Sequence, residues 1–157
     1  MSNNEPSRSE MQFYHKLRKT IKIWAGGRDS RANRYLDYIM AGPDLFILMA
    51  RLSRDDRLSQ ADRTKLGGAV AYFINPMDLM PELILGPPGL VDDIALAALV
   101  LHDVLETVDP AVIREHWEGS IDVLEMTRSI LDVADTMVGG PIWRQLLATA
   151  QSFISGR

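Results

Sequence analysis

The feature that most constrains this chain is an uninterrupted apolar run, IALAALVL, at Ile94–Leu101. The segment stays largely apolar as far as Val108, and its first polar residues are His102 and Asp103. A helix that is apolar on every side has no face for solvent and is normally buried at the centre of a protein. The run therefore predicts a central helix near residues 94–108, with the rest of the chain packed around it.

The remaining apolar residues recur three or four positions apart, which is typical of amphipathic helices. No stretch alternates with period two over a convincing length, so we expect no sheet. A chain of 157 residues is of single-domain size. We therefore expect an all-α fold, a compact single-domain bundle of seven or eight helices over residues 9–157, after a disordered tail at residues 1–8. The expected helices lie near residues 9–25, 32–41, 43–52, 61–74, 94–108, 110–118, 121–138 and 142–154.

Local signals support several of these helices. We expect helix caps at Ser59, Asp109 and Ser120. The inner face of the helix at residues 43–52 should consist of Leu45, Leu48, Met49 and Leu52, and Ile121 should face inward in the helix at residues 121–138. A polar connector, Arg54-Asp55-Asp56-Arg57, separates the third helix from the fourth.

Net charge is unevenly distributed along the chain. Residues 1–74 carry 13 basic and 8 acidic side chains, whereas residues 75–157 carry 4 and 13, so the halves have charges of +5 and −9 within a total of −4. One interpretation is a basic arm that meets an anionic surface, and the other is that the two halves of one fold complement each other. Both interpretations stay open at the level of the sequence.

The basic arm includes the expected helix at residues 9–25, which is amphipathic. Its apolar stripe adjoins basic residues, and this combination is found in helices that lie on membrane surfaces. An ordinary helix packed on its own domain shows the same pattern. The stripe consists of Phe13, Leu17, Ile21 and Trp24, with His15 and the cations Lys16, Arg18, Lys19 and Lys22 beside it. The candidate surface-binding residues are Lys16, Arg18, Lys19, Lys22 and Trp24, which predict a weak contact with anionic membranes.

The segment at residues 72–93 reads YFINPMDLMPELILGPPGLVDD and carries the most specific signal. It resembles the signature of the YkvA-like family, a family of unknown function, through its tyrosine, its Asn-Pro step, its Leu-Met-Pro-acid step, a glycine turn and paired aspartates. The resemblance extends over a module at about residues 45–104. It implies an α-helical module and brings no established activity. Two positions depart from the pattern, because Glu82 stands where aspartate is commoner and Gly86-Pro87-Pro88-Gly89 makes a stiffer turn.

Some relatives in that family carry the module as a membrane-embedded hairpin. Here the most apolar window, residues 83–101, is interrupted by the Gly-Pro-Pro-Gly turn and then by Asp92 and Asp93. The apolar pieces on each side are far shorter than the roughly 20 residues that span a bilayer. The window therefore predicts a buried core in preference to a membrane span.

Four carboxylates in this segment invite two interpretations: Asp78, Glu82, Asp92 and Asp93. In the first, Asn75 caps a short new helix that begins at Pro76, and all four acids cap helices or complement helix dipoles. In the second, they converge on a hard divalent cation such as Mg²⁺ or Ca²⁺, whose ligands are oxygens. Arginines from preceding helices, Arg51 or Arg63, offer a simpler counter-charge. The capping interpretation explains the same residues, and the metal site is kept as the alternative.

Other chemistry is weakly represented. The absence of cysteine excludes disulfides, thiolate metal sites and a cysteine nucleophile. The metalloprotease HExxH, phosphate-binding GxxxxGK[ST], dinucleotide-binding GxGxxG and hydrolase GxSxG patterns are all missing. His102 and Glu106 share a helical face, and His116 stands between Glu115 and Trp117, without a second histidine nearby. We expect no catalytic residues.

These observations favour a non-enzymatic interaction or scaffold protein that needs no cofactor. Its partner would be another protein or a second copy of itself, with a weak anionic membrane contact through residues 9–25. The acidic total and the lack of a recognisable motif disfavour nucleic acid. The first residues lack the apolar core of a secretory signal, so we expect a cytoplasmic location. The alternative is a metal-binding protein or metal-dependent enzyme that uses the four carboxylates.

Overall fold

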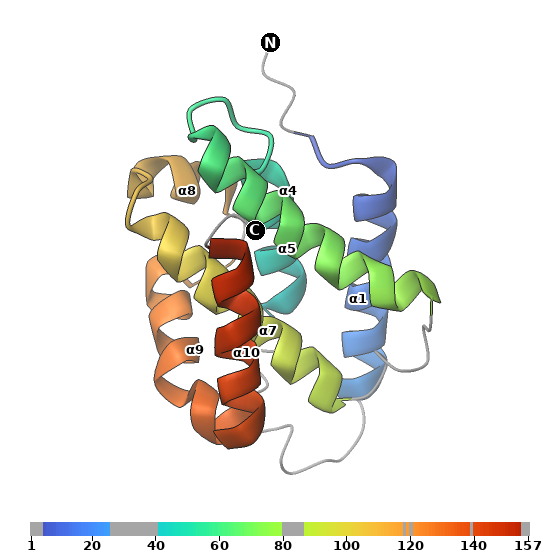
Figure 1. Ribbon diagram of the computed structural model, residues 1–157. Helices are drawn as coiled ribbons and strands as arrows, with labels where there is room; N and C mark the ends of the chain where they lie inside the picture. Colours follow the sequence, from blue (N-terminus) through green and yellow to red (C-terminus); the bar gives the residue numbers. More distant parts are fainter. Residues whose placement is uncertain are drawn as a thin grey trace.

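The computed structural model describes residues 5–25, 41–79, 87–117, 119, 121–138 and 140–154. These residues form seven α-helices and contain no strand, which confirms the all-α prediction (Figure 1). In chain order the helices are α1 (Arg8–Ala25), α4 (Gly42–Leu52), α5 (Gln60–Leu79), α7 (Pro87–Leu105), α8 (Pro110–His116), α9 (Val123–Val138) and α10 (Gly140–Ile154). None of the described helices is both long and apolar enough to cross a membrane.

The centre of the bundle is α7, as the apolar run predicts. It packs against α4, α5, α9 and α10 (Figure 1). From Ile94 to Leu101 every side chain is buried except Leu99, which is partly buried. Burial of residues 94–101 on all sides explains why this run has no polar face.

Helix α4 is the second helix with buried apolar residues on several sides, and it lies among α1, α5, α7 and α8. Pro43 occupies its first turn, where a missing N–H costs no hydrogen bond. The four residues predicted as its inner face, Leu45, Leu48, Met49 and Leu52, are all 0% exposed. Phe46 and Ile47 are buried too, because neighbouring helices cover α4 on several sides.

Helix α5 begins as predicted, with the Ser59 hydroxyl accepting from the Asp62 N–H at 3.1 Å. It then continues to Leu79, through Asn75 and Pro76, so the prediction of a separate short helix was wrong. Asp78 accordingly lies in the last turn of α5 and not at the third position of a new helix. An established helix loses one backbone hydrogen bond to an internal proline, whereas a new helix must first be nucleated.

The start of α7 also corrects a prediction. The helix begins at Pro87, seven residues before Ile94, so Asp92 and Asp93 lie within it and do not precede it as caps. Prolines suit a first helical turn because their fixed φ is preorganised and their missing N–H has no intrahelical partner there.

Two boundaries in the C-terminal half were misplaced. Helix α8 has the predicted Asp109 cap, whose carboxylate accepts from the Ala111 N–H at 2.9 Å, but it ends at His116. Asp122 precedes α9, and its carbonyl accepts from the Met126 N–H at 2.8 Å. The capping position therefore belongs to Asp122. The predicted inner residue Ile121 is 40% exposed because it lies outside the helix.

Several predictions fall outside the described residues. These are the helix at residues 32–41, the capping role of Ser120, and the position of Glu82. The division into a tail at residues 1–8 and one helical domain stays a prediction.

Candidate functional site

The first candidate site is the outward face of α1. The helix packs on α4 and lies at the edge of the bundle (Figure 1). Phe13 and Leu17 are 5% and 6% exposed, and the Phe13 ring lies 4.5 Å from the Phe46 ring, centroid to centroid. The side chains of Arg8, His15, Lys16, Arg18 and Lys19 are exposed. Helix α1 thus has an apolar inner face and a basic outer face.

Two contacts at its N-terminus fix the position of α1. The Ser7 N–H donates to the Glu10 carboxylate at 2.7 Å, and the Glu10 N–H donates to the Ser7 hydroxyl at 3.2 Å, which forms a capping box. The buried Glu10 carboxylate also pairs with Arg54 at 2.6 Å. This ion pair ties α1 to the segment that connects α4 to α5.

Of the two interpretations of the α1 stripe, packing on the domain holds for Phe13 and Leu17. Phe13 and Leu17 belong to the hydrophobic core and cannot reach a membrane while the fold is intact. The side chains of Ile21, Lys22 and Trp24 lie outside the described part of the chain. Of the predicted surface-binding residues, Lys16, Arg18 and Lys19 are exposed, and the Arg18 guanidinium donates to the Tyr14 hydroxyl at 3.1 Å.

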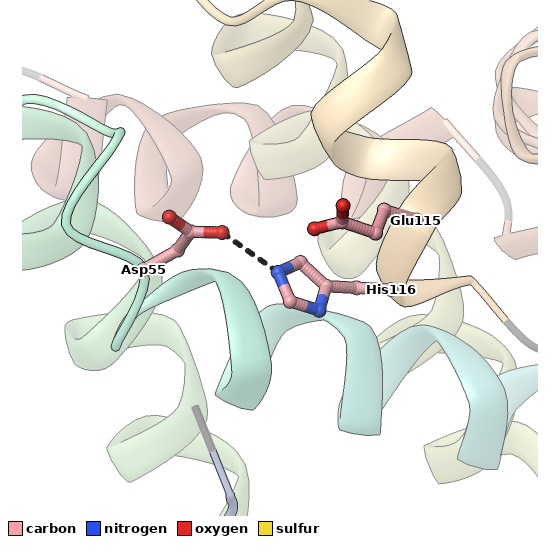
Figure 2. Close-up of side chains that lie close together, drawn as sticks. All are labelled: Asp55, Glu115 and His116. Atoms are coloured by element: carbon pink, nitrogen blue, oxygen red, sulfur yellow. Dashed lines mark hydrogen bonds and ion pairs between the residues drawn. The ribbon is translucent and has the colours of Figure 1, made fainter. Parts of the chain in front are cut away.

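The second candidate site is a polar junction between the α4–α5 connector and the end of α8, formed by Asp55, Arg57, Glu115 and His116. Asp55 is only 2% exposed. Its carboxylate accepts from the backbone N–H of Arg57 at 2.9 Å and from the Arg57 guanidinium at 2.6–3.2 Å. His116 Nε2 lies 2.8 Å from the same carboxylate (Figure 2).

The Arg57 guanidinium bridges the two acids of the polar junction. Its Nη2 lies 2.6 Å from Asp55 Oδ2 and also contacts the Glu115 carboxylate. Figure 2 shows Glu115 and His116 side by side at the end of α8, with the imidazole pointing at Asp55. The backbone carbonyl of His116 accepts from Arg51 at 3.2 Å. Residues about 60 positions apart are thereby held together.

The electrostatics of the polar junction follow from this geometry. The hydrogen bonds from the Arg57 side chain hold the pKa of Asp55 well below its usual range, and His116 adds to the effect while burial opposes it. The same guanidinium lowers the pKa of Glu115, and the two carboxylates raise the pKa of Arg57. Both acids are therefore ionised at neutral pH. The cluster offers two carboxylate oxygens and one imidazole nitrogen within 4.8 Å of one another.

A third group of charges joins α5 to α7. Asp62 is 3% exposed and accepts from the Thr107 hydroxyl at 2.7 Å. Lys65 Nζ lies 2.9 Å from Asp103 and 3.5 Å from Asp62. The bond to Asp103 raises the pKa of Lys65. Each buried charge in this group has an opposite charge or a donor beside it, as a structural contact requires.

The four acids predicted as caps or metal ligands are not brought together by any described contact. Asp78 lies in the last turn of α5, Asp92 and Asp93 lie near the start of α7, and Glu82 lies outside the described residues. The side chains of Asp78, Asp92 and Asp93 also lie outside the described part of the chain, so a cation site formed by these acids stays a prediction.

Sequence reasoning missed the polar junction. It identified Arg54-Asp55-Asp56-Arg57 only as a polar connector and His116 as a lone histidine. The presence of both signs of charge in the connector gave a local signal, because Asp55 and Arg57 are close enough in sequence to pair. Nothing in the sequence indicated that residues 115–116 would meet them.

Comparisons with known proteins place the module but name no activity. A stretch of 91 residues is 30% identical to "Uncharacterized protein ORF9" of Methanothermobacter thermautotrophicus, covering 58% of this chain. The match spans about 60% of the length of that relative. No solved structure matches the chain at a significant level. Residues 62–99 match the family described as "Protein of unknown function (DUF1232)", which is consistent with the YkvA-like resemblance of the motif at residues 72–93.

Proposed function

We propose that this protein is a non-catalytic helical binding module that docks weakly on anionic membrane surfaces through the outer face of α1. One observation carries the proposal, namely that the exposed ionised side chains among residues 8–19 all have the same sign. They are Arg8, Lys16, Arg18 and Lys19, while the acid of this stretch, Glu10, is buried against Arg54.

Helix geometry puts these cations away from the core. At 100° per residue, Arg8 and Lys19 lie nearly opposite Phe13 and Leu17, with Lys16 and Arg18 on the two flanks. An ordinary surface helix mixes both signs on its outer face and gains from pairing them. A face of one sign favours an anionic partner.

The strength of the contact can be estimated from the charges. Each cation held near an anionic membrane contributes about 1 kcal/mol, so four supply about 4 kcal/mol, a dissociation constant of about 1 mM. Phe13 and Leu17 are buried in the core, so they cannot insert into the lipid and strengthen the contact. Binding should therefore be weak and sensitive to salt.

The non-catalytic part of the proposal is supported by the pairing of the buried acids. Glu10 meets Arg54, Asp55 meets Arg57 and His116, and Asp62 meets Lys65 and Thr107. Such contacts engage the carboxylate oxygens with partners inside the fold, and Arg57 holds the pKa of Asp55 low, whereas a general acid or base needs a pKa near the working pH. A location at the cytoplasmic face of a membrane is part of the same proposal.

The test is co-sedimentation with anionic phosphatidylserine vesicles and with neutral phosphatidylcholine vesicles, each at low and high salt. We expect binding to anionic vesicles at low salt alone. The variant Arg8→Gln/Lys19→Gln should weaken it about 30-fold, since two cations contribute about 2 kcal/mol.

The matched control removes two exposed cations elsewhere, Arg128→Gln/Arg144→Gln, on α9 and α10. It should bind like the wild type. Equal loss in both double variants would mean that net charge, and not the α1 face, governs binding. Equal sedimentation with both vesicle types, or none with either, would refute the membrane proposal and leave a protein partner or self-association.

A further inference from the structure

We propose that Asp55, Glu115 and His116 form a divalent-cation site suited to Zn²⁺, and that the Arg57 side chain holds the place of the ion in its absence. The inference goes beyond the proposed function, because it concerns the polar junction and uses no residue of α1. It rests on how the three ligand side chains converge (Figure 2) and on the contacts that Arg57 makes with two of them.

The three ligand atoms already lie close to a coordination sphere. They are within 4.8 Å of one another, and Asp55 Oδ2 is 2.8 Å from His116 Nε2. Two ligands at about 2.0–2.1 Å from one tetrahedral ion are about 3.3 Å apart. Small rotations of side chains would therefore suffice to surround an ion, and the backbone need not move.

Two of the ligands are preorganised. Asp55 is 2% exposed, and its carboxylate accepts a hydrogen bond from the N–H of Arg57. His116 is the last residue of α8, and its side chain is 10% exposed. The third, Glu115, has a side chain that is 57% exposed and can turn toward the ion. Rigid buried ligands with one mobile exposed ligand leave a way in for the ion from solvent.

A cation already lies between the two carboxylates of this cluster. Arg57 Nη2 contacts the carboxylates of Asp55 and Glu115 at once, which marks the point where positive charge is most favoured. Yet the Arg57 side chain is 48% exposed on a flexible stem, so it can leave toward solvent. A divalent ion in its place would balance both carboxylates without the guanidinium.

The donor set selects the ion. One imidazole with two carboxylates suits Zn²⁺, which accepts nitrogen and oxygen ligands and keeps its fourth position for water. Mg²⁺ and Ca²⁺ prefer oxygen ligands and gain little from His116. Because Arg57 competes with the ion, the site should bind Zn²⁺ less tightly than the same ligands would alone.

Competition gives the experiment its sharpest expectation. Isothermal titration with ZnCl₂ should show one ion bound per chain, and Arg57→Gln should bind it at least 10-fold more tightly than the wild type. In the Arg57→Gln background, His116→Gln and Glu115→Gln should each weaken binding at least 10-fold. Glu115 is exposed, so its substitution leaves the fold intact, and circular dichroism of every variant checks this.

His102→Gln is the matched control, because His102 is an exposed histidine of α7, four residues before Glu106 in the sequence, and is not one of the three proposed ligands. It should leave Zn²⁺ binding unchanged. Binding of Zn²⁺ to Arg57→Gln no tighter than to the wild type would overturn the proposal. So would unchanged binding after the Glu115 and His116 substitutions, or tighter binding of MgCl₂ than of ZnCl₂.

Discussion

Asp55 should carry far more of the stability than its neighbour Asp56, although both stand in the same polar connector. Asp55→Ala removes the acceptor of the Arg57 backbone N–H and the partner of His116 Nε2. Both bonds go to the charged Asp55 carboxylate, and a hydrogen bond to a charged group contributes about 1.5–3 kcal/mol. The Arg57 guanidinium still contacts Glu115 and solvent, so we add no further loss for it. The expected cost of Asp55→Ala is therefore about 3–6 kcal/mol.

The measurement is urea unfolding followed by circular dichroism at pH 7, with zinc excluded by chelator. Asp55→Asn keeps an acceptor and should cost less than Asp55→Ala. Asp56→Ala is the matched control, because the Asp56 side chain is 88% exposed and lies 3.5 Å from Arg63, a pair expected to add less than about 1 kcal/mol.

Comparable costs for Asp55→Ala and Asp56→Ala would refute this reasoning. They would mean that the polar junction forms without contributing to the fold, and that burial of Asp55 is a poor guide to its energetic role. A change in the slope of the urea transition would instead point to an altered unfolded state, so the midpoint and slope must be compared together.

Three further predictions concern the rest of the fold. Leu96→Ala should lower the free energy of unfolding, measured in urea, by about 3–5 kcal/mol. Leu99→Ala should lower it clearly less, because Leu96 is 0% exposed and Leu99 is only partly buried. Equal losses would contradict the packing of α7. Gly67→Ala should stabilise the protein by about 0.5–1 kcal/mol, because a Cβ there meets no atom within 4 Å in the middle of α5, and a lowered melting temperature would contradict this. Lys65→Met should destabilise the protein at pH 8, where the wild-type ammonium is charged. The difference in free energy of unfolding between variant and wild type should shrink as the pH rises above 10.5 through the raised pKa of Lys65. A difference that does not change with pH would show that the charge of Lys65 is not the cause.

Local patterns predicted the helices whose ends carry local signals. The Ser59 and Asp109 caps and the proline at the start of α4 were all recognisable, because a cap is made by residues a few positions apart. The same local rules failed at Pro76, where α5 continues to Leu79. There the energy of extending an existing helix outweighs the loss of one hydrogen bond, and that balance is set by packing and not by the proline alone.

The polar junction could not be predicted for a related reason. Asp55 and His116 are 61 residues apart, and their meeting depends on α8 packing against α4. A polar connector on the surface and a polar connector folded over a buried carboxylate have the same composition. Burial of a charge becomes visible only once the helices are assembled, and then the pairing of Asp55 with Arg57 follows from the cost of leaving it alone.

The same assembly limits how α1 can meet a membrane. Amphipathic helices that insert into lipid must turn their apolar face outward. In this protein that face is held inward by the packing of Phe13 on Phe46, and the ion pair between Glu10 and Arg54 secures the start of the helix. Separating α1 from the bundle would expose the apolar side chains of Phe13 and Leu17 and break the ion pair of the buried Glu10 with Arg54. Four cations supply too little free energy to offset that loss, so contact with an anionic surface should leave the helix packed and use its outer face alone.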